Sequence, residues 1–130
     1  MRNRIIFSAG AIFLFFVFAC GDIFSKKTHI VGPYYLTDGE TQGNFSIYFL
    51  TSNGNLIQKV PARVKEYGYF DSILVAKVVE KNDKELYYII NMSKDYDVAK
   101  EHLFRLGPID SASFKQSFTT QPKIKWIQAE

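Results

Sequence analysis

Apolar and polar residues alternate along the chain in short runs, a pattern typical of half-buried β-strands. In the run from Phe45 to Thr51, Phe45, Ile47 and Phe49 would share one face of a strand. A second run follows after Asn53-Gly54 and covers Leu56 to Val60. Asn-Gly between two strands indicates a hairpin, because both residues tolerate positive φ in a type I′ turn.

Two later runs, Ile73 to Glu80 and Leu86 to Met92, are apolar on both faces. Strands of this kind lie in the middle of a sheet whose two faces are both covered. The polar segment Lys81 to Glu85 between them has the length of a hairpin loop. The pattern therefore predicts that the two runs are adjacent antiparallel strands at the centre of a sheet.

Turn and cap residues mark the other segments. Pro33 interrupts the run from Ile30 to Leu36 and places that strand at an edge or bulge, because proline donates no backbone hydrogen bond. Asp110 is predicted to be the N-cap of a short helix over Ser111 to Ser117. The remaining expected elements are a strand from Ala62 to Tyr67, a helix or strand from Asp97 to Arg105 that ends at Leu106 to Ile109, and an edge strand from Ile124 to Ile127.

These segments amount to six to eight short strands with one or two short helices near the C-terminus. We expect a mainly β fold, a compact antiparallel sheet with a sandwich-like or barrel-like form. The 130 residues suffice for one such domain and not for two. A content of 47% hydrophobic and 16% aromatic residues excludes a disordered chain.

The first twenty residues have a different character. Arg2 and Arg4 precede an uncharged stretch of fifteen residues from Ile5 to Ala19. A membrane-spanning helix needs about 20 such residues, whereas a signal-peptide core is shorter. We therefore interpret residues 1–19 as an export signal.

The end of this stretch resembles the lipobox of bacterial lipoproteins: Val17 is the aliphatic residue, Ala19 the small one and Cys20 the new N-terminus. Phe18 is bulkier than the usual residue at its position. The resemblance implies a diacylglycerol on the Cys20 thiol, commonly with a second acyl chain such as palmitate, and hence a membrane anchor. An ordinary signal cut near Ala19 and an uncleaved membrane anchor are the alternatives.

On this interpretation residues 20–28 are the lipidated N-terminus and a tether, and residues 29–130 form the single β domain. The chain would lie in the cell envelope, and Gly21 beside the cysteine favours the outer membrane if the cell has two membranes. Cys20 is the only cysteine, so the domain has no internal disulfide and no free thiol for catalysis.

From about Ile30 to Phe114 the order of motifs resembles a family of small bacterial lipoproteins that contain a domain of unknown function. The motifs are, in order, Gly32 to Tyr35, Val64 to Gly68, Asp71 with Ile73 to Lys77, Tyr87 to Asn91, and Gly107 to Asp110. In those relatives the Tyr-Ile-Ile strand usually ends in Asp, where this chain has Asn91. The motifs look structural, with Gly68 and Gly107 expected at turns, and the resemblance implies no activity.

The side chains that carry chemistry are few and scattered. Once Arg2 and Arg4 are set aside, 14 basic and 13 acidic residues remain, and they are interspersed, which argues against nucleic-acid binding. His29 and His102 are too few and too far apart for a metal site. No serine lies in a Gly-x-Ser-x-Gly turn. The sequence therefore predicts no catalytic residue, no metal and no cofactor.

Paired aromatic residues are the feature most open to a functional interpretation. We expect one tyrosine of each pair to pack inward and the other to face solvent, where it would contact a protein, peptide or glycan. The alternative is a purely structural role, because tyrosine is favoured in half-buried strands. The candidate contact residues are Tyr34, Tyr35, Tyr67, Tyr69, Tyr87 and Tyr88.

Two classes of function follow from these observations. The first is a non-enzymatic binding or structural module, held at the bacterial envelope by the lipid on Cys20. The second is a small envelope hydrolase whose active site gathers His29 or His102 with distant residues. A toxin-immunity role is a further alternative.

Overall fold

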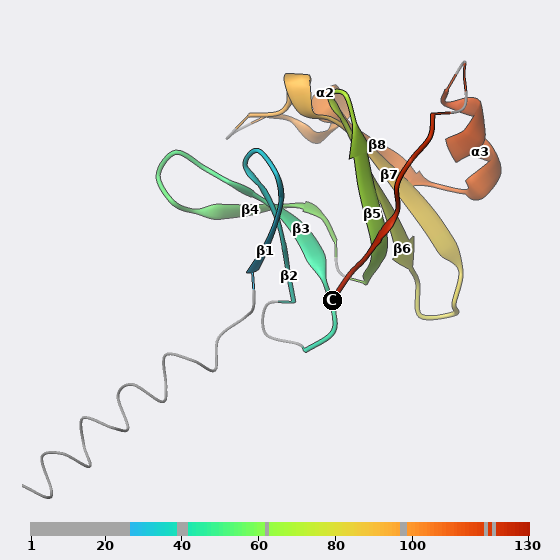
Figure 1. The fold of residues 1–130 in the computed structure, drawn as a ribbon, viewed down its shortest axis with the longest axis horizontal. Helices are drawn as coiled ribbons and strands as arrows, with labels where there is room; N and C mark the ends of the chain where they lie inside the picture. Colours follow the sequence, from blue (N-terminus) through green and yellow to red (C-terminus); the bar gives the residue numbers. More distant parts are fainter. Residues whose placement is uncertain (1–26, 39–41, 62, 97–98, 119, 121) are drawn as a thin grey trace, which may run out of the picture.

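The protein folds as two antiparallel sheets that pack as a sandwich, which confirms the expected mainly β class. The computed structural model describes residues 27–38, 42–61, 63–96, 99–118, 120 and 122–130 (Figure 1). Sheet A has the strand order β1-β2-β3-β4 and sheet B the order β8-β7-β6-β5-β9. The described residues thus form nine strands, one more than the upper end of the predicted six to eight, because the run from Ile30 to Leu36 is divided between two strands.

Sheet A contains β1 (Lys27–Val31), β2 (Tyr34–Thr37), β3 (Ser46–Leu50) and β4 (Leu56–Val60). The prediction of one strand over Ile30 to Leu36 is wrong, because the chain reverses at Gly32-Pro33 and β1 pairs antiparallel with β2. Gly32 takes a φ of +54°, which a glycine adopts without steric cost. Since β1 begins at Lys27, the last two residues of the predicted tether belong to the first strand.

The Asn53-Gly54 hairpin is confirmed, since β3 pairs antiparallel with β4. Its turn is not the predicted type I′, because of the two residues only Gly54 has positive φ, at +84°. The Gly54 N–H donates to the Thr51 carbonyl at 3.0 Å, and the Thr51 N–H donates to the Asn55 carbonyl at 2.8 Å. This is a three-residue loop that ends in a left-handed glycine, a common alternative for hairpins.

Sheet B contains β5 (Val64–Phe70), β6 (Ile73–Val79), β7 (Glu85–Asn91), β8 (Arg105–Ile109) and β9 (Ile127–Gln128). The prediction for its centre is confirmed, because β6 and β7 are adjacent and pair from Ile73↔Asn91 to Val79↔Glu85. Leu106 to Ile109, expected to end an element, instead lie in β8. They extend the sheet because they pair with the free side of β7.

Three short helical elements complete the described chain: η1 (Met92–Lys94), α2 (Glu101–Phe104) and α3 (Ser111–Gln116). The predicted cap of the last helix is confirmed, because the Ser113 N–H donates to Asp110 Oδ1 at 2.8 Å. The segment for which helix and strand were both open contains α2 and the first residue of β8. A terminal edge strand is present as β9, which pairs with β5, but it covers Ile127–Gln128 and shares only Ile127 with the predicted run from Ile124.

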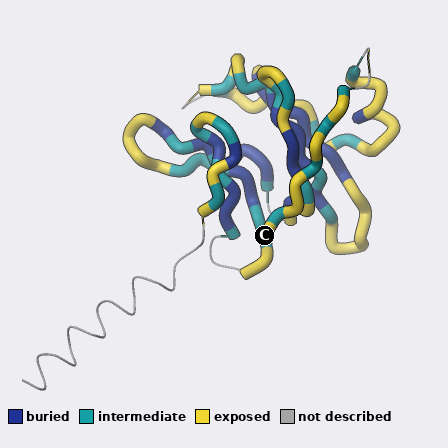
Figure 2. Tube along the Cα trace, viewed as in Figure 1, coloured by how far each residue is buried: buried dark blue, intermediate teal, exposed yellow. Residues whose placement is uncertain are grey.

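Sheet B is buried on both faces, as the double-sided apolar pattern of its central strands requires. Its inner face, which includes Leu74 and Ile90, packs against Leu36 and Ile47 of sheet A. Figure 2 shows buried segments, in dark blue, in both sheets. Its outer face carries Val75, Tyr87 and Ile89, and it is covered by α3 and the C-terminal segment through Phe114, Phe118, Ile124 and Trp126.

Gly68 is not at a turn, as the sequence suggested, but lies within β5 where the C-terminal segment crosses the sheet. A Cβ at this position would lie 2.7 Å from Ile124 Cγ2 and 2.9 Å from the Lys125 carbonyl oxygen. Gly107 likewise lies inside β8, with a φ of +131°. Both glycines therefore permit close packing of backbone on backbone.

Candidate functional site

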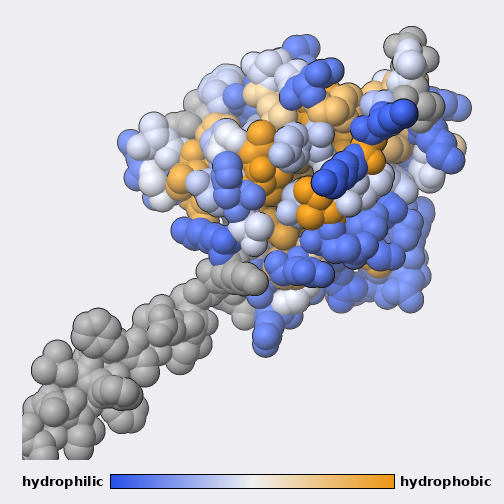
Figure 3. All heavy atoms as spheres, in the orientation of Figure 1, coloured by the Kyte–Doolittle hydropathy of each residue, from blue (hydrophilic) through white to orange (hydrophobic). Residues whose placement is uncertain are grey.

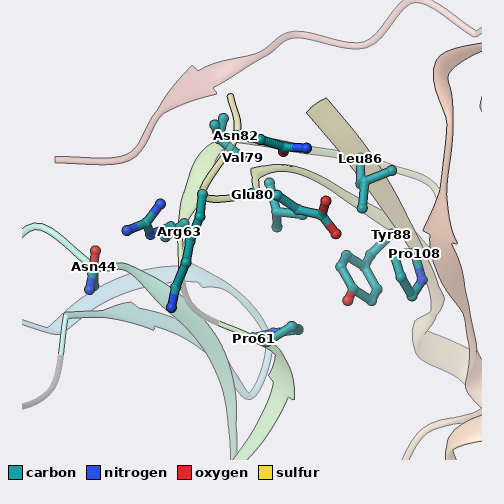
Figure 4. A pocket seen from close by; sticks show the side chains of 11 residues that line it. Asn44, Pro61, Arg63, Val79, Glu80, Asn82, Leu86, Tyr88 and Pro108 are labelled. Atoms are coloured by element: carbon teal, nitrogen blue, oxygen red, sulfur yellow. The ribbon is translucent and has the colours of Figure 1, made fainter. Parts of the chain in front are cut away.

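A groove lies between the segment that links β4 to β5 and the β6–β7 hairpin (Figure 4). Its volume is about 720 Å³, within the range of sites that bind small ligands. The tip of the β6–β7 hairpin beside it is hydrophilic in Figure 3, whereas apolar atoms reach the surface over the central part of the fold. The lining residues are Asn44, Pro61, Arg63, Val78, Val79, Glu80, Lys81, Asn82, Leu86, Tyr88 and Pro108.

The floor of the groove is apolar. Val78 and Leu86 lie directly opposite each other on β6 and β7, and Tyr88 follows on the same inner face of β7. Pro108 of β8 and Pro61 after β4 add further apolar surface. Alternation along the strands explains this floor, since every second residue of β6 and β7 faces the inside of the sandwich.

The walls of the groove carry opposite charges. Figure 4 places Arg63 and Glu80 on different sides of the space, with Asn44 and Asn82 at its rim. Within the described part of the chain, neither Arg63 nor Glu80 forms a salt bridge. The Arg63 guanidinium and the Glu80 carboxylate, which have no ion-pair partner among the described residues, are therefore available to a ligand, and Lys81 adds a second positive charge to the lining.

The backbone of Arg63, in the wall of the groove, is strained. Its φ is +77°, in the left-handed region that non-glycine residues rarely adopt. Two backbone contacts hold it there: the Val79 N–H donates to its carbonyl at 3.0 Å, and the next residue, Val64, donates to the Phe45 carbonyl at 3.0 Å. Such strain costs about 1 kcal/mol or more and is often found where a side chain must be aimed at a ligand.

Tyr88 contributes a hydrogen-bonding group to the apolar floor. Burial raises the pKa of its hydroxyl, so the phenol stays protonated at neutral pH. The Arg105 guanidinium carbon lies 5.3 Å from the centre of the ring and packs against it. The phenol can therefore donate a hydrogen bond to a ligand in the groove (Figure 4).

Of the six tyrosines predicted to contact a partner, Tyr88 lines the groove. Tyr34 and Tyr67 are buried between the sheets, Tyr35 is half-buried on β2, and Tyr69 is 44% exposed at the end of β5. The expectation of one exposed tyrosine per pair is wrong for Tyr87 and Tyr88, which are both buried. The reason is that α3 covers the outer face, where Tyr87 stacks on Phe114 with 4.5 Å between ring centres.

The two histidines do not belong to the groove. His29 is exposed on β1, where its Nε2 lies 2.8 Å from the Gly32 carbonyl oxygen, and His102 is exposed on α2. The described residues contain no group of three or more side chains that could hold a metal ion. Arg63 and Glu80 were not singled out from the sequence, because residues far apart in the chain gave no local motif.

Comparison with models of known protein families, with curated proteins and with solved structures found no match. The resemblance to a lipoprotein family therefore stays a prediction. The signal segment and Cys20 lie outside the described residues. Among the residues that are described, no helix is long and apolar enough to cross a membrane.

Proposed function

We propose that this protein is a non-enzymatic binding module of the bacterial cell envelope that holds a short peptide segment in the groove. The observation that carries this proposal is the combination of an apolar floor with Arg63 and Glu80 on different walls, neither of which forms an ion pair with another described residue. The predicted lipid on Cys20 would supply the location of the module.

A peptide suits this chemistry better than the other ligand classes considered. Arg63 would pair with a carboxylate of the peptide and Glu80 with an ammonium group, while apolar side chains rest on Val78 and Leu86. Glycans are usually held on exposed aromatic faces, and the one aromatic in the groove, Tyr88, is only 6% exposed. Nucleic acid needs an extended basic surface, whereas the basic residues of the lining are Arg63 and Lys81, with Glu80 beside them.

Binding is also favoured over hydrolysis. The hydrolase alternative depends on a histidine that meets a carboxylate and a nucleophile in one cavity. His29 and His102 are both exposed and neither lines the groove. The toxin-immunity alternative gains no support from any contact described above.

The anchor would keep this groove close to the membrane. If Cys20 carries the lipid, the chain from Cys20 to Lys27 can span at most about 25 Å, at 3.3 to 3.6 Å per residue. The bound peptide would then belong to a component that lies near the membrane surface.

Selection from a library of short peptides against the purified full-length chain tests the proposal. We expect enriched peptides that carry an apolar residue between a positive and a negative group. Arg63→Asn should weaken their binding about tenfold, which corresponds to about 1.4 kcal/mol. Because asparagine tolerates positive φ, this variant should unfold at the same or a higher denaturant concentration than the wild type.

Two carboxylates of the same hairpin region provide the matched control. Glu80→Gln should weaken binding as Arg63→Asn does, whereas Glu85→Gln, which lies outside the lining, should leave it unchanged. Failure to enrich any peptide, or equal losses for Glu80→Gln and Glu85→Gln, would contradict the proposal.

A further inference from the structure

A lysine and an aspartate are in contact inside the sandwich. Lys59 belongs to β4 of sheet A, and Asp95 follows η1 at the end of β7 in sheet B. The Lys59 Nζ lies 2.9 Å from Asp95 Oδ1, and the two side chains are 3% and 0% exposed. The pair therefore connects the two sheets through the interior of the fold.

A β-bulge turns Lys59 inward. The register between β3 and β4 shifts between Ile47↔Val60 and Tyr48↔Gln58, which leaves Lys59 as the extra residue. Lys59 and Val60 are consequently both buried, although neighbours on a regular strand face opposite sides.

Aromatic side chains surround the pair. The Lys59 Nζ lies 4.3 Å from the centre of the Phe104 ring and 5.2 Å from that of Phe49. The second oxygen of the carboxylate, Asp95 Oδ2, accepts a hydrogen bond of 2.7 Å from the Tyr34 hydroxyl. Burial raises the pKa of Tyr34 far above its usual range, so the hydroxyl keeps its proton.

The contact lets a proton pass directly from the Lys59 ammonium to Asp95 Oδ1. A buried ammonium and carboxylate pay a large desolvation penalty, which transfer of one proton from Lys59 to Asp95 removes. The products are a neutral amine and a carboxylic acid held in contact. A neutral amine is a nucleophile, and positioning the two reactants together removes most of the entropic barrier to their reaction.

We propose that Lys59 and Asp95 condense into an intramolecular amide. After the proton transfer, Lys59 Nζ attacks Asp95 Cγ and the N–C bond forms. Tyr34 donates to Oδ2, where negative charge develops. The C–Oδ1 bond then breaks, and the hydroxyl leaves with a proton from Nζ as water. No oxidant, reductant or other reactant is consumed.

The amide would serve as a covalent link between the sheets. The chain has one cysteine, Cys20, so a disulfide cannot fulfil this role within the domain. Loss of water also removes both buried charges. A further contact joins the two sheets at the same place: Arg105 Nη1 of β8 donates to the Lys59 carbonyl of β4 at 2.9 Å.

Peptide mapping by mass spectrometry of the full-length chain tests this proposal. Trypsin should fail to cut after Lys59, and the digest should contain residues 28–63 joined to residues 95–100, with a mass lower than the sum of the two peptides by one water. Lys77 and Glu66 are the internal control, because their atoms lie 3.0 Å apart but their side chains are 19% and 17% exposed. Trypsin should cut normally after Lys77.

Variants separate the reaction from the ion pair. Lys59→Arg keeps the positive charge but offers no neutral amine, so the joined peptide should disappear. Tyr34→Phe keeps both reactants and removes the donor to Oδ2, so the joined peptide should form at least tenfold more slowly. Normal cleavage after Lys59 throughout the wild-type sample would overturn the proposal. Equal rates in the wild type and in Tyr34→Phe would overturn the role assigned to Tyr34.

Discussion

The two faces of sheet B bury apolar side chains by different means. The inner face meets sheet A, and residues such as Leu74 and Ile90 are fully enclosed between two layers of strands. The outer face is covered by one short helix, α3, and by the irregular C-terminal segment. Ile89 on this face keeps 9% of its surface exposed, whereas its neighbour Ile90 on the inner face keeps none.

Each face also holds one lysine–carboxylate pair. Comparing the two pairs separates the effect of the N–O distance on stability from the effect of burial. Lys59–Asp95 on the inner side and Lys77–Glu66 on the outer side have nearly equal N–O distances, 2.9 and 3.0 Å. Both lysines lie over aromatic rings. Only the inner pair is cut off from solvent, and burial rather than distance determines how much the pair contributes to the free energy of unfolding.

The largest expected effect follows from breaking the inner pair. Asp95→Ala should lower the free energy of unfolding by about 3–5 kcal/mol, because it leaves the Lys59 side chain buried without a partner. Glu66→Ala on the outer face should cost no more than about 1 kcal/mol. Denaturant unfolding of the two variants, each beside the wild type, measures the difference.

A double substitution sharpens that comparison. Lys59→Met combined with Asp95→Leu removes both polar groups and should recover the part of the loss caused by Asp95→Ala that comes from an unpartnered buried lysine. If Asp95→Ala and Glu66→Ala have equal midpoints, burial does not distinguish the pairs and the comparison fails.

A smaller difference is expected between neighbouring isoleucines of β7. Ile90→Ala on the inner face should cost about 4 kcal/mol, and Ile89→Ala on the outer face about 2 kcal/mol, because a short helix and an irregular segment can collapse into a cavity more readily than a second sheet. Denaturant midpoints again provide the measurement, with Asn82→Ser as a loop control that stays within about 0.5 kcal/mol. Isoleucine variants as mild as this control would show that β7 is not central.

The smallest effect concerns the cap of the helix that covers the outer face. The Ser113 backbone N–H donates to the Asp110 carboxylate and holds its pKa below the usual value. Because the folded pKa is lowered, the stabilisation is present above the unfolded pKa of about 4 and is lost as the pH falls through the folded value. Unfolding midpoints of wild type and Asp110→Asn across this acid range should converge at the lowest pH. A constant difference at every pH would contradict this role of the carboxylate.

The candidate site could be predicted only in part. Tyr88 was recognisable as one of a pair of tyrosines on an apolar strand, and such pairs suggest contact surfaces. Arg63 and Glu80 gave no such signal. They line the same groove only because the segment after β4 crosses to sheet B beside the β6–β7 hairpin. The burial of Lys59 was equally hidden, since it requires a bulge in β4 and a carboxylate from the segment after η1, distant in the sequence.

Local pattern alone determined the β class, the pairing of β6 with β7, the β3–β4 hairpin and the Asp110 cap. Each of these depends on side-chain periodicity or on neighbours a few residues apart, which the chain itself contains. The tertiary structure decided the division into two sheets, the burial of Tyr87 beneath α3, the groove and the contact of Lys59 with Asp95. These features arise where segments distant in sequence meet, and their free energy depends on what each residue packs against rather than on its own preference.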